Sequence, residues 1–175
     1  MKGETEKRKQ ALTTQVTAEL KGRLGKKQAE LAALYVEQCF RRVPLEELVA
    51  ESPASLSAIV ASQLDFLAQR KPGQLLIRVF NPTIDNDGWE SPHTIIELVN
   101  DDMPFLVDTA TLTLSELGLG IHLIVHPVIR AGRDRKGNLT TIHPKKSGKG
   151  RAESVMQFQV DRRTSEDDLN SIRDS

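Results

Sequence analysis

The fold is decided by residues 94–108, which read TIIELVNDDMPFLVD. The apolar run Thr94–Val99 is typical of a strand, and the polar group Asn100–Asp102 supplies side chains that cap helices. Pro104 suits the first turn of a helix. The stretch therefore predicts a strand followed directly by a helix, which ends at Gly118. The expected buried face of this helix comprises Leu106, Val107, Ala110, Leu114 and Leu117.

Three more strands and a helix are expected after this helix. Ile121–Arg130 is predicted as one long strand, and a turn over residues 134–138 leads into a short strand, Leu139–Ile142. Ser154–Asp161 alternates as a further strand, and Thr164 or Ser165 caps a final helix. From Thr94 onward the order is that of a split βαβ plait without its last strand. The sequence therefore predicts an α+β fold with an incomplete ferredoxin-like βαββα plait.

A plait without its final strand leaves Thr94–Val99 at the edge of the sheet. Natural proteins cover such edges because an unpaired strand promotes aggregation. We therefore expect that the chain is a fragment or that another segment fills the place. Gln74–Phe80, which also alternates as a strand, is the internal candidate and would pair antiparallel with Thr94–Val99.

Helices are expected before the plait. Leu12, Val16, Leu20 and Leu24 recur at helical spacing, and a second helix is predicted from Lys27 to about Arg42, where Pro44 stops it. Ser52 and Pro53 begin a third helix. The predicted organisation is a helical segment over residues 1–73 and an α+β domain over residues 74–175.

Composition limits the functional classes. The 175 residues carry 24 basic and 24 acidic side chains, so no net field favours nucleic acid or an anionic membrane. Neither a secretory signal nor a run of roughly 20 apolar residues is present, so we expect a cytoplasmic protein that neither enters a membrane nor binds nucleic acid. Cys39 is the only cysteine and reads as a buried apolar side chain.

Six blocks of the sequence carry a resemblance to a known family. They lie in a consistent order between about Leu34 and Asp161, and the run Asn100–Asp108 is too long for a chance motif. The chain resembles the N-terminal region, with its ACT-like domain, of the large-subunit bacterial NAD-specific glutamate dehydrogenases. The blocks are Arg70–Gly73, Arg78–Thr83, Gly88–Thr94, Glu97–Asp108, His122–Val128 and Glu153–Phe158.

The resemblance implies a role in an enzyme that converts L-glutamate, NAD and water into 2-oxoglutarate, ammonia and NADH. The segment would be its non-catalytic regulatory or oligomerisation portion, with the remainder of the dehydrogenase polypeptide, a second copy and an amino-acid effector as partners. NAD is implied for the full-length enzyme and for no residue of this segment. Two alternatives stay open: a stand-alone ACT-like amino-acid-binding module, and a purely structural oligomerisation piece.

The expected effector-binding loop comprises Asn100, Asp101, Asp102, Met103 and Phe105. It joins a strand to a helix N-terminus, where free N–H groups stabilise a carboxylate, and the aspartates would meet an ammonium group. The simpler alternative is that both aspartates only cap the helix, because capping motifs are common.

No catalytic, cofactor-binding or metal-binding residue is predicted in the chain. His122 and His126 are roughly 13 Å apart on one extended strand, too far for a single zinc ion. The run Gly118–Gly120 follows a helix, which is the wrong context for a dinucleotide loop. The basic run between Lys145 and Arg151 reads as a solvated loop.

Overall fold

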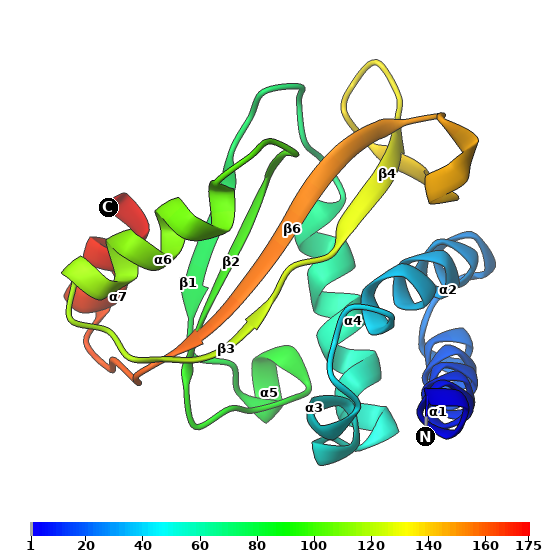
Figure 1. The fold of residues 1–175 in the computed structure, drawn as a ribbon, viewed down its shortest axis with the longest axis horizontal. Coiled ribbons are helices and arrows are strands. Elements are labelled where there is room, and N and C mark those ends of the chain that lie inside the picture. The colour runs from blue at the N-terminus through cyan, green and yellow to red at the C-terminus, as the bar shows by residue number, and fades with distance from the viewer. Residues whose placement is uncertain (1) are drawn as a thin grey trace. The chain divides into compact units, whose positions relative to one another are not determined.

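The computed structural model describes residues 2–175; residue 1 of the predicted segment 1–73 lies outside the described residues. Figure 1 shows the helices and strands of these residues. The chain forms two compact units. Unit 1 comprises the residues up to Arg70 together with Ile129–Arg151, and unit 2 comprises Lys71–Val128 and Ala152–Ser175. The predicted boundary at residue 73 lies near the end of the first segment, and the division into 1–73 and 74–175 stays a prediction.

Unit 1 is built on helices that pack through the predicted apolar stripes. Val16 and Leu20 are fully buried, and the first helix contacts the second and the fourth. Ser52 caps the fourth helix, because its hydroxyl accepts a hydrogen bond from Ser55 N at 3.1 Å. The predicted starts at about Lys27 and at Ser52–Pro53 are therefore confirmed, because α2 begins at Lys26 and α4 at Pro53. The helices are α1 (Lys2–Arg23), α2 (Lys26–Phe40), α3 (Leu45–Ala50) and α4 (Pro53–Leu67).

The short helix α3 was not expected from the sequence. Pro44 follows α2 but does not end the helical region. Its backbone angles suit the residue before a helix, and α3 begins directly after it. Leu45 and Leu48, three residues apart, are buried on one side of the short helix. A helix of six residues carries too little periodicity to be recognised in the sequence.

An antiparallel hairpin completes unit 1. It consists of β4 (Val128–Arg133) and β5 (Leu139–His143), as predicted for the turn over residues 134–138. Arg133 Nη1 donates to the carbonyl oxygens of Leu67 and Gly137, both at 2.9 Å, which attaches the hairpin to the end of α4. A short 3₁₀ turn, η1 (Lys145–Ser147), follows β5.

Unit 2 contains the expected plait. Its sheet has the order β1-β2-β6-β3 with antiparallel neighbours, and β1 pairs with β2 from Leu76 opposite Val99 to Phe80 opposite Ile95. The segment before the plait therefore occupies the place of the plait's final strand, which confirms the predicted cover of the edge. The strands are β1 (Leu76–Phe80), β2 (Thr94–Asp101), β3 (Ile121–Val125) and β6 (Arg151–Val160).

Two helices cover one face of this sheet, α6 (Leu106–Glu116) and α7 (Glu166–Asp174). Ser165 caps α7 as predicted, since its hydroxyl accepts from Asp168 N at 3.1 Å. A third, short helix, α5 (Ile84–Asp87), lies in the turn-rich segment before β2 and was not expected. The core between helices and sheet comprises Ile96, Leu114, Leu119, Met156, Phe158, Val160 and Ile172.

Two predictions in this region are wrong. The expected strand Ile121–Arg130 is two strands, β3 and β4, because Pro127 has no N–H for a sheet ladder, and its carbonyl accepts from Val155 N instead. Leu117, expected in the buried face of α6, is 38% exposed, because the helix ends at Glu116 and Leu117 lies beyond its last full turn.

Candidate functional site

The loop between β2 and α6 was predicted to cap α6, and it does not do so in the structure. β2 continues through Asp101, which pairs with Glu153, and α6 begins only at Leu106. The prediction that Asn100–Asp102 caps this helix, with Pro104 in its first turn, is therefore wrong. The physical reason is the length of β6: it runs back to Arg151 and offers Asn100 and Asp101 ladder partners, so these residues stay extended.

Phe105 takes the N-cap position of α6 in an unusual conformation. Its φ of 66° lies in the left-handed region, where it is the only non-glycine residue among the described part of the chain. Such a conformation costs a residue with a Cβ about 1–2 kcal/mol. The ring gains little burial in return, because Phe105 is 76% exposed. Strain at an exposed aromatic residue is more typical of functional loops than of packing.

Asp102 is fixed by a short polar chain. Ser154 Oγ donates to Asp102 Oδ1 at 2.6 Å, and His126 Nε2 lies 3.1 Å from the same hydroxyl. Asp102 N also donates to Ala152 O at 3.0 Å. Ser154 is fully buried and its proton points to the aspartate, so the three residues do not form a nucleophilic triad. Their effect is to attach the loop to β6.

A pocket of about 470 Å³ opens beside this loop in unit 2. Its volume falls within the range of small-molecule sites, and most of its walls are apolar, as is typical of such sites. Of the predicted loop residues, Asn100, Met103 and Phe105 line it together, whereas the two aspartates do not. Other walls come from Leu75, the residue before β1, and from β2, α6 and α7, represented by Leu98, Ala110, Thr113 and Arg173.

The position of the aspartates follows from the alternation of β2. Ile96, Leu98 and Asn100 face the pocket, so their neighbour Asp101 extends from the opposite face of the sheet. Asp102 lies just beyond the strand and is exposed. The predicted loop thus divides into a part at the pocket and a part outside it.

Arg173 and Leu75 line the pocket but were not predicted. They lie far from the loop in sequence, on α7 and next to β1. Neither has a local signature, because only the pairing of β1 with β2 and the docking of α7 bring them to the loop. Their position could not be read from spacing.

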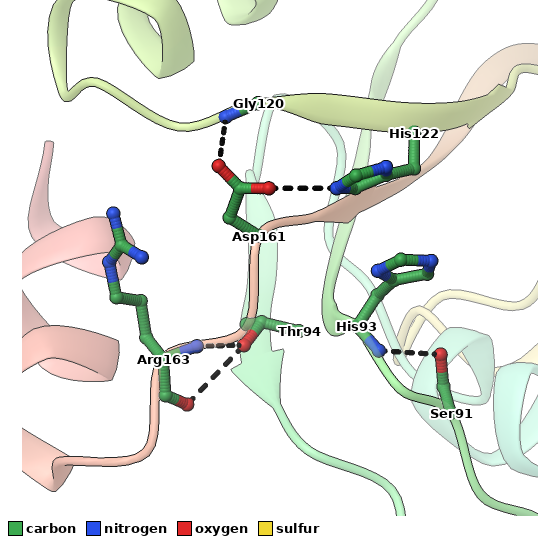
Figure 2. A network of polar contacts seen from close by, with 7 residues as sticks. All are labelled: Ser91, His93, Thr94, Gly120, His122, Asp161 and Arg163. Atoms are coloured by element: carbon green, nitrogen blue, oxygen red, sulfur yellow. Dashed lines mark hydrogen bonds and ion pairs between the residues drawn. The ribbon is translucent and has the colours of Figure 1, made fainter.

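A second polar cluster, shown in Figure 2, surrounds Asp161. Its carboxylate accepts from Gly120 N and lies within hydrogen-bond distance of His122 Nε2, at 2.8 Å in each case. The hydrogen bond from the Gly120 amide, and then the contact with His122, hold the pKa of Asp161 below its usual value. The ring of His93 stacks on that of His122 with centroids 4.2 Å apart and planes at 15°. Stacked, nearly parallel rings do not point their nitrogens at one metal ion.

Within residues 2–175, no group of three or more His, Cys, Asp or Glu side chains has the geometry to hold a metal ion. None of the described helices combines the length and apolar character needed to cross a membrane.

Comparisons with known proteins match most of the chain. The family model described as glutamate dehydrogenase, ACT1 domain, matches residues 35–175. An NAD-specific glutamate dehydrogenase of Halomonas elongata is 32% identical over 166 residues, which cover 94% of this chain and 10% of the relative. One from Pseudomonas aeruginosa is 35% identical over 150 residues, or 85% of this chain and 9% of the relative. The chain thus spans about a tenth of the length of these relatives. No solved structure matches the chain.

Proposed function

Because the chain belongs to the glutamate dehydrogenase ACT1 domain family, we propose that it is a non-catalytic regulatory portion of an NAD-specific glutamate dehydrogenase. The observation that supports this best is the family match over residues 35–175. A pocket beside a strained loop lies in the same region. In the complete enzyme, NAD and glutamate would bind to other parts of the polypeptide. The reaction would yield 2-oxoglutarate, ammonia and NADH in the cytoplasm.

The proposed effector contact is the loop Asn100, Asp101, Asp102, Met103 and Phe105. An amino acid at the loop would place its ammonium group near Asp102, whose carboxylate is exposed and held in one orientation by Ser154. Its side chain would lie toward Met103 and Phe105, which are 49% and 76% exposed. Binding there would bias the conformation of the loop and thereby the rest of a homo-oligomeric enzyme.

Two measurements test this proposal. The purified 175-residue chain is expected to reduce no NAD with glutamate, and measurable turnover would overturn the non-catalytic role. In the complete enzyme, Asp102→Asn is expected to abolish the response to the activating or inhibiting amino acid while kcat without effector stays unchanged. Asp108→Asn, an exposed carboxylate on the neighbouring helix, serves as the matched control. An unchanged response in Asp102→Asn would exclude the loop as the contact.

The stand-alone binding module remains the alternative function. A reading frame that stops directly after Ser175 would favour it, whereas a frame that continues for many hundreds of residues would favour the dehydrogenase.

A further inference from the structure

Among the described side chains that line the pocket of unit 2, one is positively charged and none is negatively charged. Arg173 is the only charged side chain among the described residues that line it, and no acidic side chain does. Its Nε donates to Asp174 Oδ1 at 2.9 Å, and both side chains of this pair are largely exposed at the end of α7. Within the described part of the chain, the two terminal nitrogens of this guanidinium donate to no acceptor, so they can bind a ligand.

Asn100 adds a second donor on the strand side of the pocket. Its Oδ1 accepts a hydrogen bond from Asp101 N at 2.9 Å, which orients the side chain. The Nδ2 group is the remaining donor of this side chain, and Asn100 lines the pocket. The hydroxyl of Thr113 is occupied, because it donates to Thr109 O at 3.1 Å within α6. The pocket therefore offers donors and a positive charge, and its remaining lining is mostly apolar.

We propose that this pocket binds a small monocarboxylate with an apolar body and no ammonium group, such as a branched-chain 2-oxo acid. The hydrocarbon body lies against Leu98, Ala110 and Met156, and the carboxylate meets the guanidinium of Arg173. Among the described residues, no acidic side chain lines the pocket to pair with an ammonium group there, and burying a charge without a partner is costly. An α-amino acid with the same side chain is therefore the weaker ligand.

This inference rests on the proposed regulatory function and narrows its ligand class. It differs from the amino-acid contact at Asp102, because Asp102 does not line the pocket. The two can be separated by ligands that share one hydrocarbon body and differ only in their charged groups.

The experiment is calorimetric titration of the purified chain with 4-methyl-2-oxopentanoate, leucine and 3-methylbutan-1-amine. We expect the oxo acid to bind at least tenfold more tightly than leucine, and the amine not to bind. Arg173→Gln should weaken the oxo acid roughly tenfold to a hundredfold, the range for a lost hydrogen bond to a charged group. Ala110→Leu, which fills the pocket, should also weaken it, whereas Leu112→Gln, on the exposed side of the same helix, should not.

Each of the other outcomes contradicts one part of this proposal. Leucine that binds as tightly as the oxo acid overturns the ligand class assigned here and leaves the amino-acid contact of the loop standing. Oxo-acid binding that survives Arg173→Gln unchanged overturns the assigned carboxylate contact. No heat with any of the three compounds overturns the pocket as a ligand site, and it also removes the support for leucine-type effectors at the loop.

Discussion

Arg78 of β1 and Glu97 of β2 are register partners, and Arg78 Nε donates to Glu97 Oε2 at 2.5 Å. The other carboxylate oxygen accepts from Gln157 Nε2 at 3.0 Å, and Gln157 is the partner of Glu97 on β6. Glu97 is only 2% exposed. One row of three side chains thus joins three neighbouring strands and holds β1 in the place that a plait gives to its final strand.

Removing the cation from this row should destabilise the chain. Arg78→Leu leaves a buried carboxylate with fewer donors, so we expect the free energy of unfolding to fall by about 3 kcal/mol, the lower end for a buried pair. The lower end applies because Arg78 is 27% exposed and Gln157 still donates. Urea denaturation measures the change. Arg41→Leu is the control, because its pair with Glu37 is exposed and should be worth about 0–1 kcal/mol. Equal losses in both variants would show that the row does not hold β1.

Because Phe105 has a left-handed conformation, glycine at this position should give a more stable chain than alanine, the reverse of the usual order. At φ 66° glycine carries no Cβ penalty, so Phe105→Gly should be more stable than Phe105→Ala by about 1 kcal/mol. Leu112 lies in the middle of α6 with its side chain exposed to solvent. Here Leu112→Ala should be more stable than Leu112→Gly by about 1 kcal/mol, because glycine lowers helix stability. Melting temperatures of the four variants provide the measurement. The same order at both positions would contradict the strained loop.

The sequence predicted the parts of the fold that depend on local patterns. Ser52 and Ser165 cap helices as expected, and the alternation of Gln74–Phe80 correctly indicated the strand that covers the edge of the sheet. The end of β2 could not be predicted in this way. Asn100 and Asp101 have the side chains of a cap, yet β6 provides them with ladder partners from a segment more than 50 residues away.

Only part of the candidate site was predicted, because local patterns do not report tertiary contacts. The sequence singled out the loop that contains Asn100, Met103 and Phe105, and these residues do line one pocket. It gave no indication of Arg173, because the contribution of α7 depends on how that helix packs on the sheet. A local pattern can identify a loop, whereas the opposite wall of a pocket depends on tertiary structure.

Burial of Cys39 predicts an unreactive thiol. The residue is 5% exposed on α2, and loss of solvation raises its pKa to about 12, against a smaller opposing effect of the hydrogen bond with Tyr35. Because the thiolate is the reactive form, we expect no measurable labelling by a thiol reagent at pH 8 in the native chain. Full labelling of one thiol is expected after denaturation in urea. Rapid labelling of the native chain would contradict the packing of α2.

The cluster around Asp161 predicts a stability difference that depends on pH. The amide of Gly120 and the ring of His122 hold the pKa of Asp161 in the folded state below the ordinary value of 3.8. A carboxyl with a lowered folded-state pKa contributes stability above its unfolded pKa and loses it as the pH falls through the folded value. Asp161→Asn should therefore be less stable than the unmodified chain at pH 7, and the difference should shrink as the pH falls below about 3.8.

Denaturation midpoints at pH 7, 5, 4 and 3 measure this dependence. Glu90→Gln, an exposed carboxyl in the loop before β2, is the matched control and should show no comparable loss at pH 7. If the Asp161→Asn difference stayed constant down to pH 3, the effect would come from lost shape or packing around Gly120. The charge of the carboxylate would then contribute nothing, and the network in Figure 2 would not stabilise unit 2 electrostatically.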